Sequence, residues 1–366
     1  MWRPQCLRAK LTALAWVVFA GILAGLLYVA FLASAELLPL TWQLLRNGVL
    51  NGATITGMIG VFEIFVWAGP IAAPLRRRSF PVRLLVKTTV YTCLVLAILI
   101  AYNVWLLPSA ETTSAARRYV MTGLAQDTAF SLLIVLLIQF VMQMRRLIGG
   151  RVLANIVLGR YARPRREHRA FLFVDLVDST AIARRLGDVE THALISRVFF
   201  DLDTVITAHG GEVHRYVGDE VVVTWPLDAA LRDGRCLRCA VAIRERLARR
   251  ASAYRRRFGV EPAIRAGLNG GPVVAGECGD ARVEIVYFGD TINTAARLQQ
   301  ATRAMRHWLL VPTALIDRMP AIPGWSRTEV GTVTLRGRDD PIALCTLTPG
   351  APPAEQPRAV DRRRAA

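Results

Sequence analysis

Long uncharged runs near the N-terminus constrain this chain more than any other feature of its sequence. Four of them are apolar over about 20 residues, the length that an α-helix needs to cross the hydrocarbon core of a bilayer. With 53% hydrophobic residues, the chain is also too apolar for an ordinary soluble enzyme. The sequence therefore predicts a transmembrane bundle of four helices over residues 1–144, with spans at about 11–34, 50–73, 85–107 and 120–143.

Basic residues flank these spans unevenly. They cluster before the first span, between the second and third, and after the fourth. Because cytoplasmic loops are enriched in Lys and Arg, we expect a multi-pass protein of the cell or inner membrane whose N-terminus and C-terminal half are cytoplasmic. The first span ends in Ala33-Ser34-Ala35, which resembles a signal-peptidase site, but its length favours an uncleaved anchor.

Two acidic residues fall inside predicted spans, Glu63 in the second and Asp127 in the fourth. An ionisable side chain in hydrocarbon is costly and indicates a ligand, ion or proton site. A packing contact with Asn51, Asn103 or a buried water is the alternative. Both interpretations stay open, and Glu63 is the stronger candidate because Asp127 lies nearer a span end.

The formal net charge of +18 would be compatible with a nucleic-acid partner. Much of the excess lies beside the apolar spans, where membrane orientation explains it. No basic face interleaved with aromatic residues is visible, so we expect no nucleic-acid partner. Cys236 and Cys239 form a lone C-x-x-C within a helical pattern and are interpreted as helix positions, because a metal or redox site would need partners that the sequence lacks.

Beyond the spans, residues 145–167 have apolar positions near helical spacing until Pro164 and predict a helical coupling linker, with a plain tether as the alternative. Residues 168–348 follow as one domain, and residues 349–366 are rich in Pro, Ala and Arg and are expected to be disordered. The domain shows strand and helix patterns in the order β-α-β-β-α-β plus further strands, two of them about Gly270-Gly271. This order predicts an α+β ferredoxin-like palm with an antiparallel sheet.

Two carboxylates fall where strands of this palm end. Asp175 closes the first strand, and Gly218-Asp219 is a two-residue connection between the next two. Those strands are central neighbours, so both acids can meet at one end of the sheet. Paired carboxylates repel each other unless a divalent cation joins them, and Mg²⁺ is commonly held by two carboxylates plus substrate phosphates. The alternative is that both are ordinary turn residues.

The stretch TINTAARLQQ places Asn293 and Arg297 one helical turn apart, on one face. A rigidly held amide and guanidinium suit an oxygen nucleophile and a phosphate under attack. A solvated pair on a surface helix is the alternative interpretation.

Four segments together, FLFVDLVDST, YVGDEVV, GPVVAGE and YFGDTINTAARL, resemble in order and spacing the catalytic domain of class III adenylate/guanylate cyclases, over about 168–348. The resemblance implies a head-to-tail homodimer with two sites at its interface and two divalent cations, Mg²⁺ or Mn²⁺, per site. It also implies in-line attack of the ribose 3′-hydroxyl on the α-phosphorus of a nucleoside triphosphate, with release of pyrophosphate.

By position, the resemblance assigns metal binding to the carboxylates of Asp175 and Asp219 and the backbone carbonyl of Leu176. It assigns the transition-state pair, supplied from the other subunit, to Asn293 and Arg297. The residues implied to bind the phosphates are Val177, Asp178, Ser179 and Thr180 through their backbone and Arg336 through its side chain, with Arg338 as the nearby alternative.

The family pattern breaks at the purine. Adenylate cyclases commonly read adenine with a lysine and with an Asp or Thr, and the matching positions here hold Arg215 and Val286. Arginine replaces a point donor with a planar fork, and valine can accept nothing from an amino group. ATP is the expected substrate, with cyclic AMP as product. GTP, or a nucleotide-binding signalling domain with little or no turnover, is the alternative.

Two further classes are less well supported. A transporter or channel would be expected to show inverted repeats, which are not visible. A diguanylate cyclase shares a similar palm, but its Gly-Gly-acid-acid-Phe hairpin is missing and the N-x-x-x-R helix argues against it.

Overall fold

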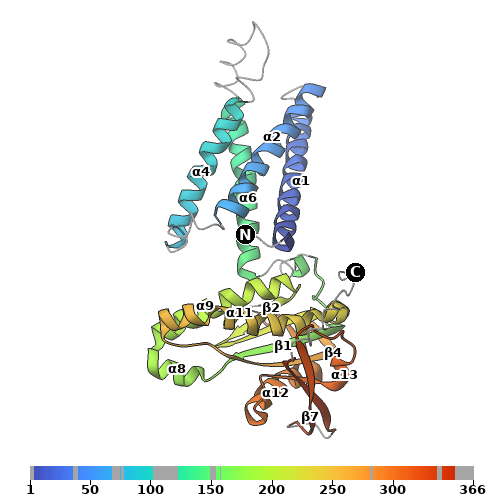
Figure 1. Ribbon diagram of the computed structural model, residues 1–366. Coiled ribbons are helices and arrows are strands. Elements are labelled where there is room, and N and C mark those ends of the chain that lie inside the picture. The colour runs from blue at the N-terminus through green and yellow to red at the C-terminus, as the bar shows by residue number, and fades with distance from the viewer. Residues whose placement is uncertain are drawn as a thin grey trace, which may run out of the picture. The chain divides into compact units, whose positions relative to one another are not determined.

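A computed structural model describes residues 4–35, 40–67, 75, 78–101, 123–148, 154–156, 158–280, 283–335 and 340–350 of the chain. The chain divides into two compact units, Met1–Ala154 and Asn155–Ala366. The elements of both are labelled in Figure 1.

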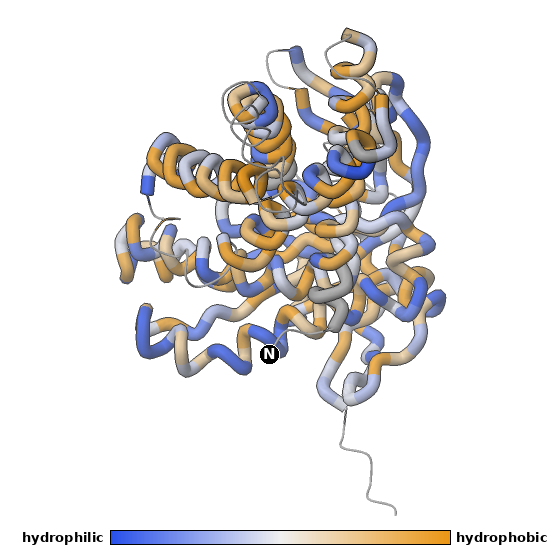
Figure 2. The backbone as a smooth tube through the Cα atoms, turned by 90° about the horizontal axis from the view of Figure 1, so that it is seen from above, coloured by the Kyte–Doolittle hydropathy of each residue, from blue (hydrophilic) through white to orange (hydrophobic). Residues whose placement is uncertain are grey.

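The first unit is helical, as predicted. Four of its described helices are long and apolar enough to cross a membrane, over Lys10–Ser34, Leu44–Val66, Pro81–Ile100 and Leu124–Met144. Figure 2 colours the backbone by the hydropathy of each residue. The helices are α1 (Pro4–Ser34), α2 (Trp42–Val61), which continues into the π-helical turn η1 (Phe62–Val66), α4 (Phe80–Ile100) and α6 (Leu124–Ile148).

The second helix begins earlier than predicted. We expected its span from about residue 50, whereas the side chain of Thr41 accepts a hydrogen bond from the amide of Leu44 and caps a helix that begins at Trp42. The predicted ends of the second, third and fourth spans at 68–73, 102–107 and 120–122 lie outside the described residues.

Glycines let α1 and α2 cross with their backbones in contact. A Cβ atom at Gly25 would lie 2.1 Å from the carbonyl oxygen of Gly48, and one at Gly52 would lie 2.2 Å from that of Gly21. Small residues at the crossing are the usual means by which membrane helices pack closely. Large apolar side chains such as Leu133 are exposed instead, as lipid-facing positions would be.

Glu63 is buried in the η1 turn and has protein partners. Its Oε1 accepts hydrogen bonds from Lys87 Nζ at 2.5 Å and Tyr91 Oη at 2.9 Å, both on α4. Lys87 and Tyr91 were not among the partners that the sequence suggested, which were Asn51, Asn103 or a buried water, and Asn103 lies outside the described residues. An ion pair in this setting joins α4 to the end of α2.

The second unit is built on an eight-stranded sheet in the order β2-β3-β1-β4-β6-β8-β7, with β5 paired to β4. The first four strands in this order match the predicted palm. The sheet is mixed rather than antiparallel, because β4 and β6 pair in parallel. Its strands are β1 (Arg165–Leu176), β2 (Glu212–Val217), β3 (Glu220–Pro226), β4 (Ile264–Cys278), β5 (Glu284–Phe288), β6 (Leu309–Pro312), β7 (Trp325–Val333) and β8 (Ile342–Pro349).

Helices cover both faces of this sheet. Side chains alternate along β1, so that Leu172 and Val174 enter the main core with residues of α9 and α11. In Figure 1, α9 and α11 lie over one face of the sheet and α12 over the other. The helices are α8 (Ser179–Leu186), α9 (Asp188–Ala208), α10 (Leu227–Leu231), α11 (Arg235–Phe258), α12 (Asp290–Met305) and α13 (Thr313–Ile316).

Two predictions about this unit are corrected. The two strands expected about Gly270-Gly271 form one continuous strand, β4, and the helix expected near 228–257 is broken into α10 and α11 by a 3₁₀ turn. Cys236 and Cys239 are fully buried on α11, where burial raises the pKa of both thiols.

The close packing of α12 on the sheet depends on Gly267 of β4. A Cβ atom there would lie 2.3 Å from the backbone nitrogen of Gln299 and 2.4 Å from the carbonyl oxygen of Ala295. Glycine therefore allows the helix backbone to touch the strand, which fixes the position of every side chain that α12 carries.

Candidate active site

Asp175 and Asp219 meet at one end of the sheet. Strand β1 runs antiparallel to β3 with Val174 opposite Val221, so the end of β1 lies beside the β2–β3 turn. Gly218 opens this turn with φ of +61°, a left-handed conformation that glycine adopts without steric cost. The carboxyl groups of Asp175 and Asp219 are close enough to share a hydrogen bond.

The electrostatics of this end of the sheet are unfavourable for free carboxylates. Burial, followed by the charge of Asp219 and the hydrogen bond with it, raises the pKa of Asp175 to about 6. Burial and the charges of both aspartates raise the pKa of Glu220 to about 7. The site therefore concentrates negative charge that a divalent cation would relieve.

The donor set fits a cation held jointly by protein and substrate. In the described part of the chain, no group of three or more His, Cys, Asp or Glu side chains is arranged to hold a metal ion alone. Asp175 and Asp219 supply carboxylate oxygens, and the buried Leu176 follows Asp175 directly and carries the carbonyl that the sequence pointed to. The remaining ligands would be substrate phosphates and water, as is usual for Mg²⁺.

Sequence reasoning missed two residues of this site. Gln299 Nε2 donates a hydrogen bond to Asp175 Oδ2 at 3.0 Å, and Glu220 adds its charge from the first position of β3. Glu220 follows Asp219 directly, so the hairpin itself carried the signal. Gln299 could be found only from the way α12 crosses β4.

The predicted phosphate-binding backbone forms the turn from β1 into α8. The amide of Val177 already donates to the carbonyl oxygen of Ala263 at 2.9 Å. Asp178 is the N-cap, and Ser179 and Thr180 open the helix, where first-turn amides lack intrahelical acceptors and suit an anion. The carboxylate of Asp178 pairs with Arg265 at 3.6 Å.

Asn293 and Arg297 lie on the outward side of α12. In the described part of the structure neither side chain has a hydrogen-bond or ion-pair partner, Asn293 is exposed and Arg297 is partly buried. At about 100° per residue, Arg297 projects roughly 200° away from Gln299 around the helix. Since Gln299 contacts Asp175, the pair faces away from the Asp175 of its own chain.

The two positions matched to purine recognition lie on β2 and β5, which an ion pair connects. The guanidinium of Arg215, on β2, forms an ion pair with Oε2 of Glu284, on β5. Glu284 and Val286 are two residues apart in one strand and therefore share a face. Glu284, which sequence reasoning missed, thus brings a carboxylate beside Arg215 at a position two residues from Val286.

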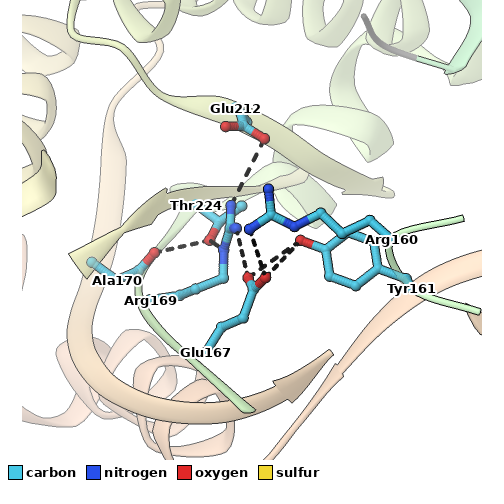
Figure 3. Close-up of polar contacts among 7 residues, drawn as sticks. All are labelled: Arg160, Tyr161, Glu167, Arg169, Ala170, Glu212 and Thr224. Atoms are coloured by element: carbon cyan, nitrogen blue, oxygen red, sulfur yellow. Dashed lines mark hydrogen bonds and ion pairs between the residues drawn. The ribbon is translucent and has the colours of Figure 1, made fainter. Parts of the chain in front are cut away.

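A buried arginine, Arg169, ties several strands together (Figure 3). Arg169 of β1 donates from Nε to Thr224 Oγ1 at 3.0 Å and pairs with Glu167 at 3.2 Å and Glu212 at 3.7 Å. Tyr161, from the segment before β1, donates to Glu167 at 3.1 Å. The network therefore connects the segment that enters the second unit to β1, β2 and β3.

The same network reaches the purine positions through aromatic rings. The Arg169 guanidinium lies 4.9 Å from the ring centroid of Tyr287, and the rings of Tyr287 and His214 are 5.0 Å apart. Burial, and then the neighbouring Arg215 and Arg169, lowers the pKa of His214 to about 4, so its ring is neutral at physiological pH. Tyr287 and His214 each adjoin one purine position in sequence.

Arg336, the remaining predicted phosphate-binding residue, lies outside the described residues, as does its alternative Arg338.

Known proteins are similar to this chain over part of its length. A model of the adenylate and guanylate cyclase catalytic domain family matches residues 162–345. Adenylate cyclase 2 of Rhizobium meliloti (strain 1021) is 37% identical over 213 residues, which cover 58% of this chain and 58% of that protein. Adenylate cyclase 1 of the same organism is 33% identical over 184 residues, covering 49% of this chain and 27% of that protein.

The chain therefore spans less than two thirds of the length of either relative. Among solved structures, a bacterial light-regulated adenylyl cyclase aligns with a TM-score of 0.49 and 23% identity, over 58% of this chain and 64% of that one.

Proposed function

Because the chain belongs to the adenylate and guanylate cyclase catalytic domain family through residues 162–345, we propose that it is a membrane-bound enzyme that converts ATP into 3′,5′-cyclic AMP and pyrophosphate. The observation that carries the proposal is the meeting of Asp175 and Asp219 beside the turn into α8. The four apolar helices and their basic flanks support a multi-pass protein with its N-terminus and catalytic unit in the cytoplasm.

The proposed reaction uses the acidic end of the sheet and the α8 turn together. Two Mg²⁺ or Mn²⁺ ions held by Asp175, Asp219 and the Leu176 carbonyl would lower the pKa of the ribose 3′-hydroxyl and neutralise the triphosphate. The first turn of α8 orients the terminal phosphates through its amides. Gln299 holds the Asp175 carboxyl in place by its hydrogen bond.

A second copy of the chain completes the proposed site. Asn293 and Arg297 face away from their own Asp175, so they can serve only an Asp175 presented by a partner. There the Asn293 amide would orient the ribose, and the Arg297 guanidinium would stabilise charge at the α-phosphate. Exposed Val217 and Phe288 provide apolar surface that a homodimer would cover.

The chemistry of the Arg215–Glu284 pair does not distinguish adenine from guanine. Arg215 can donate to a ring nitrogen or to O6, and Glu284 can accept from an amino group, so the pair fits adenine and guanine. ATP is proposed because the two relatives compared are adenylate cyclases by name. Guanylate cyclase activity is the second candidate, because the pair accommodates guanine as well as adenine.

Purified full-length chain in lipid nanodiscs with Mn²⁺ or Mg²⁺, given ATP or GTP, tests the proposal by mass spectrometry of the cyclic product. We expect cyclic AMP from the unmodified chain, none from Asp219→Ala, and normal amounts from Asp228→Ala, a control at an exposed acid of α10. Nucleotide binding without any cyclic product would refute turnover and leave a nucleotide-binding signalling domain.

Mixing two inactive variants tests the shared site. Asp175→Ala and Arg297→Ala each spoil both sites of a homodimer, whereas a heterodimer of the two retains one intact site. Co-expression is expected to restore up to about a quarter of the activity, since half of randomly formed dimers are mixed and each has one site of two. An absence of recovery, with mixed dimers shown by affinity tags, contradicts the interface.

A further inference from the structure

The first unit contains a partly open cavity of about 210 Å³ lined by residues of α1, α2 and α6 and by Leu99 of α4. Most of its wall is apolar, including Val29, Leu32, Ile55 and Ile134. A dry apolar cavity of about 150 Å³ is large enough to hold benzene. The space therefore suits a molecule of about one ring with a short arm.

Several of the residues that line this cavity are polar. Asp127 of α6 accepts a hydrogen bond from Tyr28 Oη of α1 at 2.7 Å, and the rings of Tyr28 and Phe130 stack at 4.1 Å. Asn51 of α2 also lines the cavity, and its side-chain oxygen is buried without a hydrogen-bond partner. Among the described residues that form the wall, one is acidic and none is basic.

These groups favour a donor that carries positive charge. In a helix bundle surrounded by lipid, a buried acceptor needs a donor from within the protein or from a ligand. The Asn51 oxygen supplies such an acceptor, the Asp127 carboxylate adds negative charge, and aromatic ring faces attract cations. A bare metal ion would need more oxygen ligands than a largely apolar wall provides.

We infer that this cavity binds a small organic amine in its protonated form, with an aromatic or short aliphatic body. The ammonium group would donate to Asp127 and Asn51, and the body would fill the apolar part of the wall. The glycine crossing described above fixes α1 against α2, so a ligand that joins Asp127 to Asn51 ties α6 to a rigid pair.

The consequence for regulation rests on the proposed function. Helix α6 is the described membrane helix nearest in sequence to the catalytic unit, from which Ile148 is separated by a short linker. An amine that holds α6 against α1 and α2 would therefore alter the cyclase rate. Binding itself does not depend on the cyclase reaction and can be measured separately.

Equilibrium binding of radiolabelled phenethylamine to the full-length chain in nanodiscs tests the site. The unmodified chain is expected to bind it saturably, with competition by unlabelled phenethylamine and much weaker competition by propylbenzene, which lacks the charge, or methylamine, which lacks the ring. Asp127→Asn keeps the shape and is expected to weaken binding by at least about tenfold, or about 1.4 kcal/mol.

Two control variants separate this inference from the proposed cyclase function. Phe140→Leu, at an exposed position of α6, is expected to bind normally. Asp219→Ala, which the proposed function predicts to be inactive, is also expected to bind normally, so that loss of catalysis and loss of binding are distinguished. Ser131→Leu fills the cavity from α6 and is expected to abolish binding in protein that elutes as the unmodified chain does.

Three results would overturn the inference. They are an absence of saturable binding to the unmodified chain, unchanged affinity in Asp127→Asn, and equal competition by propylbenzene. The last result would assign the cavity to neutral apolar molecules. If Ser131→Leu fails to fold, the isosteric Asp127→Asn decides the matter alone.

Discussion

Replacing Asp175 by asparagine should stabilise the metal-free protein while abolishing catalysis. The substitution removes one of two adjacent carboxylates and retains an oxygen that can accept the hydrogen bond of Gln299. In the unmodified chain, burial and the neighbouring Asp219 raise the pKa of Asp175 from 3.8 to about 6. Ionising Asp175 is therefore harder in the folded state than in the unfolded chain.

The size and sign of the effect follow from linkage. Each pKa unit corresponds to about 1.4 kcal/mol, which gives at most about 3 kcal/mol at neutral pH. Asp175 is only partly buried, so solvent screening reduces this to about 1–2 kcal/mol. Because the pKa of Asp175 is higher in the folded state than in the unfolded chain, protonation of Asp175 favours folding. This contribution to stability is complete below about pH 4 and is lost as the pH rises through about 6.

Denaturation of full-length protein in nanodiscs, with chelator present, measures this difference. At pH 7.5 Asp175→Asn is expected to raise the free energy of unfolding of the catalytic unit, and at about pH 4 the gain should vanish. Added Mn²⁺ should stabilise the unmodified chain but not the variant, and this protection should weaken below about pH 6 because metal ligands must be deprotonated.

The control is Asp228→Asn, an exposed position of α10, where a change within about 0.5 kcal/mol is expected. An Asp175→Asn variant that is less stable than the unmodified chain at pH 7.5 would refute the repulsion argument. Equal protection of both proteins by Mn²⁺ would refute the assignment of this carboxylate to metal binding.

Three other changes test separate parts of the structure. Glu284→Gln removes the charged acceptor of the proposed purine pair and should lower kcat/KM for ATP about tenfold, the loss of roughly 1.4 kcal/mol, with steady-state kinetics as the measure. Glu63→Gln removes the buried carboxylate that pairs with the partly buried Lys87 and should destabilise the first unit by about 3 kcal/mol in detergent unfolding, whereas replacing both residues by methionine should restore most of this stability. Gly267→Ala forces a Cβ atom into the α12 backbone and should cost about 1–3 kcal/mol along with activity, while Gly276→Ala, whose nearest neighbour is at 3.5 Å, should be tolerated in the same assays.

The parts of the site that the sequence predicted depend on short-range signals. Asp219 is placed by a two-residue hairpin, and Asp175 by the end of an apolar strand that must pair with that hairpin. Alternation and turn chemistry operate over a few residues, so both can be recognised in a single sequence. The meeting of the two carboxyl groups then follows from the strand order of the palm.

The parts that the sequence missed depend on packing between distant segments. Gln299 reaches Asp175 only because Gly267 lets α12 lie directly on β4. Glu284 reaches Arg215 only because β4 continues unbroken through Gly270. Its far end then pairs with β5, which holds Glu284. A glycine pair in a strand pattern is equally typical of a turn, which is why the continuous strand was not expected.

The first unit shows the same limit. Gln43, Arg46 and Asn47 lower the hydropathy before residue 50, so hydropathy alone predicts a span from about residue 50 although the helix begins at Trp42. Position within a span alone predicts Glu63, rather than Asp127, as the stronger candidate for a functional site. The cavity that gives Asp127 its interest is formed by three helices, and no one of them carries that information.

The acidic end of the sheet, where we propose catalysis takes place, is a source of instability that the rest of the fold must offset. Asp175, Asp219 and Glu220 repel one another, and this repulsion opposes the packing of β1 against β3. The Arg169 network lies on the same two strands and supplies hydrogen bonds and charge pairing that hold them together. Because divalent cations would remove the repulsion, metal affinity and the stability of this sheet end are thermodynamically linked. We therefore expect a substitution that weakens the Arg169 network to raise the unfolded fraction more in the metal-free protein than in the metal-bound protein, because bound metal increases the free energy of unfolding.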